Sequence, residues 1–384
     1  MIPVNEPLIS KNAEKYVLDC LKTGWVSSAG KYINQFENQF SSYIGTKFGV
    51  TTTSGTTALH LALVSAGIGP GDEVIIPDLT IISCALAVIY VGAKPILVDV
   101  EDSTGNIDSG QIKEKITKRT KAIMVVHLYG HPANLDPILK IAEKHKLLII
   151  EDAAEAHGAE VKINGTWRKA GSIGDMSCFS FYGNKIITTG EGGMLLTNNK
   201  KFYEKASLLK DLAHIPGKRF YHEKLGYNFR MTNLQAALGL AQMEEIDNYL
   251  TKKRWMAKLY SESLNDVEFL EFPKEESYAK SVFWMYTPLV KKNSKITRGK
   301  FCEELKKLGI DTRTYFIPLH SQPVLKRYGF KNRDFPISTD LAQRGFYLPS
   351  GLAITEKQIK KVVDSIKEIA SRFRHGKIKP EIQN

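Results

Sequence analysis

One lysine, Lys185, lies in a stretch whose residue types suggest covalent chemistry. The stretch is Phe179–Gly193, which reads FSFYGNKIITTGEGG. It begins within an apolar run, Met176–Phe181, that is typical of a buried strand, and it ends in a glycine-rich turn before a second run, Met194–Thr197. An ammonium group is costly to desolvate in such surroundings, which frees the amine to act as a nucleophile. A surface-loop lysine is the alternative interpretation.

A carboxylate follows an apolar strand upstream of this lysine. The run Leu147–Ile150 is fully apolar and leads into Glu151 and Asp152. Ligands bind outside the carboxyl ends of strands in an open parallel sheet, so we expect Asp152 to face a ligand there. A buried aspartate needs a cationic partner, and the protonated ring nitrogen of pyridoxal phosphate would be one. A lysine that can bond to the aldehyde and an aspartate for the ring nitrogen are the two groups that this cofactor requires.

The segment Thr53–Thr57, which reads TSGTT, joins a predicted strand to a predicted helix. A helix start offers unpaired N–H groups and a partial positive charge, and Gly55 would let a phosphate approach the backbone. Ser54 or Thr56 acting only as a helix cap is the alternative. Beside Lys185 and Asp152, the segment indicates a phosphate-binding turn.

These residues lie in a region where predicted strands and helices alternate, a pattern that predicts parallel strands with helices on both faces of one sheet. The predicted strands are Phe48–Thr52, Glu73–Ile76, Pro95–Val98, Ala122–Val126 and Leu147–Ile150. The predicted helices between them are Thr56–Ala66, Ile82–Tyr90, Ser109–Ile116 and Leu135–His145. Two further helices, Asn12–Lys22 and Lys31–Ser42, are expected before the first strand.

The polar stretch Asp266–Lys280 marks a boundary between two expected domains. We expect a large cofactor-binding domain over residues 1–265, including the N-terminal helical segment, and a smaller α+β domain over residues 266–384. The elements predicted for the smaller domain are strand Val282–Val290, helix Arg298–Leu308, strand Asp311–Phe316 and helix Thr355–Phe373. Asn164 and Gly165 predict a hairpin within the larger domain.

Five segments in this order resemble the DegT/DnrJ/EryC1/StrS family of sugar aminotransferases. They are SGTTALHLAL, VHLYGHP, EDAAEAHGA, SFYGNKIITTGEGG and GYNFRMTN, and the likeness extends from Ile2 to about Arg372. The resemblance implies an α/β protein of fold type I among the pyridoxal phosphate enzymes. In that fold a large domain with a mostly parallel sheet carries a smaller α+β C-terminal domain. The resemblance also implies pyridoxal 5′-phosphate as cofactor and Lys185 as the catalytic residue.

The cofactor contacts that the resemblance implies come from several segments. We expect Ser54, Gly55 and Thr56 on one side of the phosphate and Ser180 on the other. Glu155 is expected beside the cofactor's 3-oxygen, directly or through water.

Two further cofactor contacts are expected. One is at a position where this chain departs from the family, and the other comes from a second subunit. Family members commonly place an aromatic residue on the pyridine ring where this chain has Ile81. An aliphatic side chain covers the ring by dispersion but lacks the quadrupole contribution of about 0.5–1.5 kcal/mol. We therefore expect slightly weaker cofactor binding and the same reaction. The resemblance places Asn228 at the phosphate of a neighbouring subunit, which implies a homodimer with shared active sites.

Four side chains are candidate substrate contacts. Trp25 and Ser27 lie in a hydroxyl-rich linker that the resemblance places near the sugar site, and Arg219 lies in a charged connection. His320 ends a segment that resembles the family's strand entering the active site, although a lone histidine before a turn is equally compatible with a structural role.

The resemblance implies the transfer of an amino group from L-glutamate to C4 of a nucleotide-linked 4-keto-6-deoxy sugar. Such a reaction belongs to the synthesis of cell-surface polysaccharide, including O-antigen. We expect GDP-4-keto-6-deoxy-D-mannose as the acceptor, with UDP- or dTDP-linked sugars as the alternative. A relative that binds a ligand without turnover is the alternative of a different class.

The composition argues against several other classes of protein. The formal charge is +12, but the lysines are spread over predicted helices rather than gathered in one arm, which argues against nucleic-acid binding. No apolar run is long enough to cross a bilayer and the start shows no charged-then-apolar leader, so we expect a cytoplasmic protein without a membrane partner. The four cysteines show no metal-like spacing and are expected to be reduced, and His127 and His131 lack a third ligand, so no metal is expected.

Overall fold

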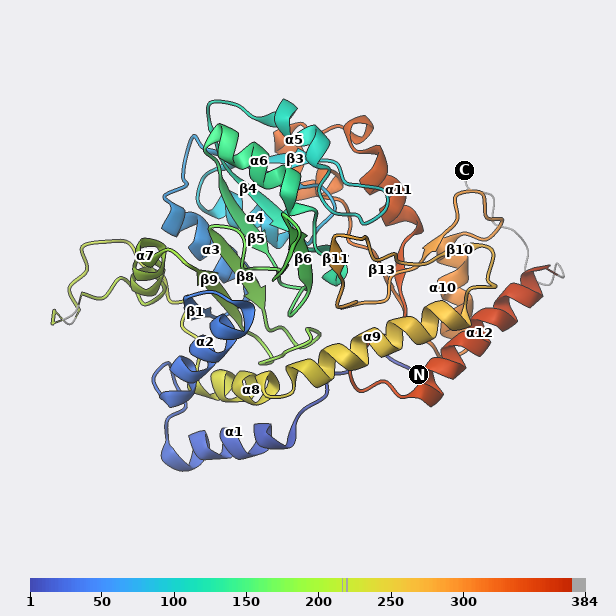
Figure 1. Ribbon diagram of the computed structural model, residues 1–384, viewed down its shortest axis with the longest axis horizontal. Helices are drawn as coiled ribbons and strands as arrows, with labels where there is room; N and C mark the ends of the chain where they lie inside the picture. The colour runs from blue at the N-terminus through green and yellow to red at the C-terminus, as the bar shows by residue number, and fades with distance from the viewer. Residues whose placement is uncertain (216, 219, 375–384) are drawn as a thin grey trace.

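A seven-stranded sheet with helices on both faces forms the centre of the molecule (Figure 1). The computed structural model describes residues 1–215, 217–218 and 220–374. The strands of this sheet are β1 (Phe48–Thr52), β2 (Glu73–Pro77), β3 (Lys94–Val98), β4 (Thr120–Val126), β5 (Leu148–Asp152), β8 (Met176–Ser180) and β9 (Gly193–Thr197). Their order in space is β1-β9-β8-β5-β4-β2-β3. β9 runs opposite to the other six strands of this sheet, so the sheet is mostly parallel, as predicted.

Both faces of the sheet are buried. The helices packed around it are α2 (Lys31–Ile44), α3 (Gly55–Ala66), α4 (Ser83–Tyr90), α5 (Ser109–Lys115), α6 (Leu135–His145), α7 (Lys200–Lys210) and α8 (Asn233–Met243). Successive side chains of a strand point to opposite faces. In β2, Val74 and Ile76 belong to the core cluster of α3, α4 and α7, whereas Ile75 belongs to that of α5 and α6. Burial on both sides is why these strands read as unbroken apolar runs.

A further core cluster holds the C-terminal part together. The elements of that part are α9 (Ile246–Ser263), β10 (Leu270–Glu271), β11 (Ala279–Lys280), β12 (Leu289–Val290), α10 (Arg298–Lys307), β13 (Arg313–Thr314), α11 (Pro336–Arg344), β14 (Phe346–Tyr347) and α12 (Glu356–Arg374). The cluster contains Tyr260 of α9, Phe301 of α10 and Ile366 of α12. It also contains Ile2, which forms a bridge to Ile310, so the N-terminus lies beside the C-terminal elements (Figure 1). The division into residues 1–265 and 266–384 stays a prediction.

The predicted hairpin is confirmed. It consists of β6 (Glu160–Ile163) and β7 (Thr166–Lys169), which pair antiparallel. The two turn residues, Asn164 at φ +48° and Gly165 at φ +83°, both have left-handed backbone conformations. This is the turn for which an Asn-Gly pair is favoured.

The predicted strand Val282–Val290 is wrong over most of its length, because pairing is limited to Leu289–Val290 and to a single bridge from Tyr286 to Leu348. Side chains from elsewhere also bond the backbone of this segment. Ser350 Oγ accepts from the amide of Tyr286, and Lys253 Nζ donates to the carbonyl of Trp284 at 2.7 Å. A sequence pattern does not reveal such side-chain partners.

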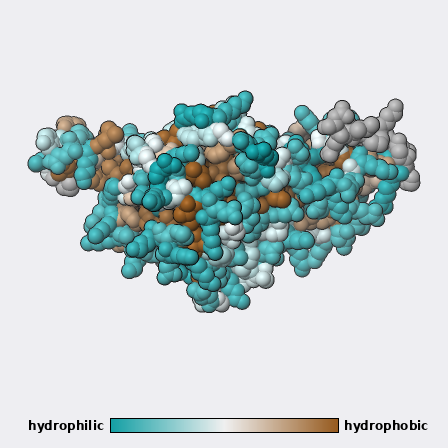
Figure 2. All heavy atoms as spheres, turned by 90° about the horizontal axis from the view of Figure 1, so that it is seen from above, coloured by the Kyte–Doolittle hydropathy of each residue, from teal (hydrophilic) through white to brown (hydrophobic). Residues whose placement is uncertain are grey.

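Apolar side chains are exposed on the segment between α7 and α8, residues 211–232, hereafter the arm. It forms one end of the molecule, where hydrophobic residues show on the surface (Figure 2). Phe220 is 76% exposed and Leu225 is 83% exposed. In the part of the chain that the structure describes, no helix has both the length and the apolar character needed to cross a membrane. All four cysteines are free thiols, as predicted.

Candidate active site

A cavity of about 260 Å³ lies where β1, β2, β4, β5 and β8 end. The predicted cofactor residues that line it are Ser54, Gly55, Thr56, Ile81, Asp152, Glu155, Ser180 and Lys185. The fold therefore gathers separate segments of the chain at the carboxyl edge of the sheet, which is where ligands bind in open α/β proteins.

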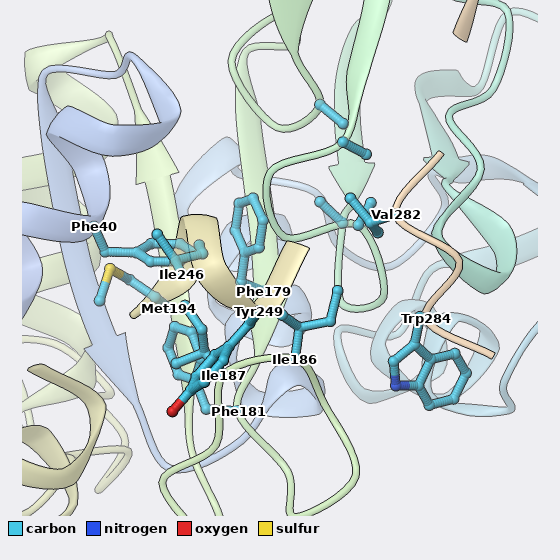
Figure 3. Packing of buried hydrophobic residues seen from close by; sticks show 14 of the residues in the cluster. Phe40, Phe179, Phe181, Ile186, Ile187, Met194, Ile246, Tyr249, Val282 and Trp284 are labelled. Carbon is cyan, nitrogen blue, oxygen red and sulfur yellow. The ribbon is translucent and has the colours of Figure 1, made fainter. Parts of the chain in front are cut away.

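The loop that carries Lys185 connects β8 to β9. Hydrogen bonds from its own threonine hydroxyls to its backbone carbonyls hold its shape. Thr188 Oγ1 donates to the carbonyl of Phe181 at 3.1 Å, and Thr189 Oγ1 donates to that of Glu191 at 2.6 Å. Behind the loop, Phe181 packs between Phe36 and Phe40, with ring centroids 4.9 and 5.2 Å away; Figure 3 shows this core with Ile186 and Ile187 pointing into it. The isoleucines after Lys185 thus anchor the loop while the lysine faces the cavity.

Lys185 lies between a carboxylate and an aromatic ring. Its side chain is 10% exposed, and its Nζ lies 3.5 Å from Glu155 Oε1 and 3.9 Å from the ring centroid of Trp284. The other carboxylate oxygen of Glu155 accepts from the amide of Tyr129 at 2.7 Å. Burial raises the pKa of Glu155 to about 7, although the charge of Lys185 opposes the rise. The Glu155 carboxyl can therefore hold a proton that it loses near neutral pH.

Asp152 is the last residue of β5, and its carboxylate is buried with only neutral partners. Oδ2 accepts from the thiol of Cys84 at 3.0 Å, and Oδ1 accepts from the amide of Ala154 at 3.1 Å. Burial and the Asp152 charge hold the pKa of Cys84 well above its usual range, so the thiol stays protonated as a donor. Among the described residues, no lysine, arginine or histidine forms an ion pair with Asp152. A buried carboxylate without a cation fits the protonated ring nitrogen of pyridoxal phosphate.

The start of α3 forms a cup at the other end of the cavity. Ser54 Oγ accepts from the amide of Thr57, so Ser54 does cap the helix. The first amides of a helix have no partner within it, and those of Gly55 and Thr56 belong to residues that line the cavity. A Cβ on Gly55 would lie 2.8 Å from Ser180 Cβ, so only glycine lets α3 approach β8 this closely. These groups suit a phosphate.

Ile81 lines the same cavity, where the sequence predicts a residue over the cofactor ring, and is 38% exposed. Aromatic side chains of Tyr182, Trp284 and Phe316 also line the cavity. Sequence reasoning missed these three. Tyr182 stands three residues before Lys185, and that nearness is a usable signal; Trp284 and Phe316 reach the cavity from distant segments and carry no local signal.

Four predicted residues that the structure describes do not line the cavity of this chain: Asn228, Trp25, Ser27 and His320. Asn228 lies in the arm and is exposed, whereas its neighbours Tyr227 and Phe229 pack on His60 of α3 with ring centroids 4.8 and 5.5 Å away. In an extended segment this alternation turns Asn228 outward.

The linker after α1 (Lys11–Thr23) holds two more of these residues. Trp25 and Ser27 are exposed, and their carbonyls accept from Asn233 at 2.7 and 2.6 Å. Arg219 lies outside the described residues.

His320 stays a predicted substrate contact, but the structure gives this side chain a structural partner and does not place it in the cavity lining. His320 Nδ1 lies 2.6 Å from Asp78 Oδ2, its amide donates to Asp78 Oδ1 at 2.8 Å, and the ring stacks on Phe335. Ser338 Oγ donates to the same carboxylate. The buried group joins the end of β2 to the C-terminal part.

The two histidines of HLYGHP are also structural. His127 Nε2 bonds Glu151 Oε2 at 2.9 Å, and its Nδ1 accepts from the amide of Ala133. His131 Nε2 accepts from the amide of Glu276. Over residues 1–215, 217–218 and 220–374, no group of three or more His, Cys, Asp or Glu side chains could hold a metal ion.

Comparison with known proteins places the chain among aminotransferases. The model of the DegT/DnrJ/EryC1/StrS aminotransferase family matches residues 7–367. The chain is 42% identical over 369 residues to the GDP-perosamine synthase of Caulobacter vibrioides, covering 96% of this chain and 98% of that protein. It is 40% identical over 372 residues to the GDP-perosamine synthase of Escherichia coli O157:H7, with coverage of 96% and 99%.

A solved structure agrees with this placement. The Spr1654 protein of Streptococcus pneumoniae in its PLP-form superposes with a TM-score of 0.90 at 25% identity. The match covers 97% of this chain and 99% of that one.

Proposed function

Since the chain belongs to the DegT/DnrJ/EryC1/StrS aminotransferase family, we propose that it transfers an amino group from L-glutamate to C4 of GDP-4-keto-6-deoxy-D-mannose and forms GDP-perosamine. The chain is a pyridoxal 5′-phosphate-dependent sugar aminotransferase, so the proposal concerns the substrate and the roles of residues. The main observation behind the proposal is that Lys185, Asp152 and the start of α3 line one cavity. The two GDP-perosamine synthases, similar over nearly their whole length, support the choice of sugar.

We assign the cofactor contacts as follows. When bound, pyridoxal phosphate supplies an aldehyde carbon that takes up the amino group and a ring that draws electrons from the carbon losing its proton. Asp152 holds the ring nitrogen protonated, and its own orientation is fixed by Cys84 and the Ala154 amide. The amides of Gly55 and Thr56, with Ser180 opposite, hold the phosphate.

Lys185 moves the proton in both halves of the reaction. Its amine, once free, takes a proton from Cα of glutamate as general base and gives one up as general acid. Glu155, 3.5 Å from Nζ, balances the charge that the lysine then carries. Because one lysine serves both the amino donor and the sugar, the kinetics should be ping-pong.

We further propose that the active enzyme is a homodimer in the cytoplasm whose arm completes the partner's site. Asn228 is exposed and points away from the core of its own chain, and the arm carries apolar side chains that a second copy would cover. Asn228 would then bind the phosphate in the neighbouring cavity.

The test supplies the holoenzyme and glutamate with GDP-, UDP- and dTDP-linked 4-keto-6-deoxy sugars and compares kcat/KM. We expect a clear preference for the GDP sugar, and Lys185→Ala, the control, should transfer no amino group. A preference for a UDP or dTDP sugar would replace the assigned nucleotide and leave the aminotransferase standing. Failure with all three by a protein that binds the cofactor would favour a ligand-binding relative or another keto substrate.

A further inference from the structure

Trp284 touches the catalytic lysine of the proposed function from a segment far along the chain. The ring lies under Lys185 Nζ, with the nitrogen 3.9 Å from its centroid. Trp284 is 3% exposed, so ring and ammonium meet largely without water. Attraction between a cation and the face of an aromatic ring is strongest for tryptophan and grows when the pair is desolvated.

The same tryptophan also fixes the backbone beside the lysine. Its indole Nε1 donates to the carbonyl of Asn184 at 2.7 Å, and Asn5 Nδ2 donates to this carbonyl at 3.1 Å. Asn184 directly precedes Lys185. Trp284, from the C-terminal part, and Asn5, near the start of the chain, therefore both hold the loop at that point. Within the loop, the amide of Lys185 donates to the carbonyl of Tyr182 at 2.9 Å, so the two outside donors add to that restraint.

Trp284 is in turn held by a buried lysine of α9. Lys253 is 2% exposed, and its Nζ donates to the carbonyl of Trp284 at 2.7 Å and to that of Ser350. This bond holds the backbone of Trp284 two residues before Tyr286, which forms a bridge to Leu348. A chain of contacts therefore runs from α9 through Trp284 to Lys185.

We propose that Trp284 is a positioning residue for Lys185, whose ring stabilises the lysine ammonium and whose indole N–H fixes the loop that carries it. The inference rests on the proposed function, in which Lys185 takes a proton from Cα of the amino donor. That proton converts the neutral amine to an ammonium, so the ring and Glu155 stabilise the charge that develops in this step. Loss of the ring should slow proton transfer more than it weakens cofactor binding.

The kinetic test compares Trp284→Leu, Trp284→Phe and Trp255→Phe, the last a control on the exposed face of α9. We expect Trp284→Leu to slow the single-turnover conversion by glutamate about 100-fold, as misplaced catalytic groups do. Trp284→Phe, which keeps an aromatic face, should fall between. The Kd for pyridoxamine 5′-phosphate, which forms no bond to the lysine, should change less than twofold in Trp255→Phe and by a much smaller factor than the rate in the two Trp284 variants. Equal loss of rate and of this affinity would indicate a merely structural role and overturn the proposal.

A second measurement does not depend on activity. The protein contains four tryptophans, so 5-fluorotryptophan labelling gives few ¹⁹F resonances, and the Trp284→Phe variant identifies that of Trp284. In the cofactor-free protein, Lys185→Met should move this resonance and leave the other three in place. An unmoved resonance would show that lysine and ring do not meet. If wild type fails the glutamate reaction while the resonance moves, the proposed function fails and the contact between Trp284 and Lys185 stands.

Discussion

Two carboxylates three residues apart have opposite surroundings, and this difference sets their roles. Asp152 has a thiol and an amide as partners and, among the described residues, no cation paired with it, which suits the proposed contact to the cofactor's ring nitrogen. Glu155 lies beside Lys185 and has a pKa raised to about 7 by burial. Sequence spacing alone gives the two side chains no such distinction.

Asp152→Asn keeps the shape of the side chain and removes the charge that holds the ring nitrogen protonated. We expect the single-turnover rate with glutamate to fall by 10²-fold or more, equivalent to about 3 kcal/mol, because a preorganised charge is lost. Asp108→Asn, at the cap of α5, is the control and should keep the rate. A rate for Asp152→Asn within about twofold of wild type would contradict the assigned role.

Glu155→Gln should change how the stability of the cofactor-free protein depends on pH. A carboxyl whose folded pKa is raised from 4.5 to about 7 binds a proton more tightly in the folded state. Its stabilisation is fully present below pH 4.5 and is lost as pH rises through 7. The free energy of unfolding of wild type should therefore fall relative to Glu155→Gln between pH 4.5 and 7, as urea titrations would measure. A constant difference between the two proteins would contradict the raised pKa.

Among the elements, α9 is joined to the segments of Trp284 and Ser350 through a buried lysine. Burial lowers the pKa of Lys253 to about 7. A neutral amine has two N–H groups, and Lys253 has two carbonyl acceptors, those of Trp284 and Ser350, so the neutral form is fully bonded. The helix thereby supports the segment that reaches the active site.

Lys253→Met should remove a contribution to stability that appears at high pH. A lysine whose folded pKa is lowered from 10.5 to about 7 binds its proton more tightly when unfolded, so its folded state gains stability as pH rises from 7 to 10.5. The free energy of unfolding of wild type should rise relative to Lys253→Met over this range. Lys258→Met, on the exposed side of α9, is the control and should run parallel to wild type. A parallel course for Lys253→Met would indicate an ordinary pKa.

At the scale of the whole molecule, no described residue of the arm lines the cavity of its own chain. The arm exposes apolar side chains at one end (Figure 2), and it presents Asn228 outward while Tyr227 and Phe229 pack on α3. Both features fit the proposed shared active site.

Mixing two inactive variants tests this sharing. If Asn228 acts in the neighbouring subunit, a dimer of one Lys185→Ala chain and one Asn228→Ala chain has one site with both residues intact. Activity should then return to a substantial fraction of wild type after subunit exchange. Each variant alone is the control, and a mixture that exchanges subunits but stays inactive would place both residues in one chain's site.

The sequence by itself determined the fold class and the chemical centre of the site. Apolar runs buried on both faces gave the five strands before residue 153 nearly at their observed bounds, and strand ends placed Asp152 and the start of α3 correctly. Lys185 was found because lysine is out of place between apolar runs. These signals are local: they depend on residue types within a few positions of one another.

Only the tertiary structure decided which distant residues complete the site. The sequence left His320 open between a substrate contact and a structural role, and the fold brings it to Asp78, which lies far upstream. Trp284 looked like part of a strand, yet pairing begins only at Tyr286, Lys253 bonds the Trp284 carbonyl, and the ring of Trp284 meets Lys185. The physical reason is the same in both cases. A buried polar group takes the partner that the folded chain brings near, and that partner leaves no mark on the neighbouring sequence.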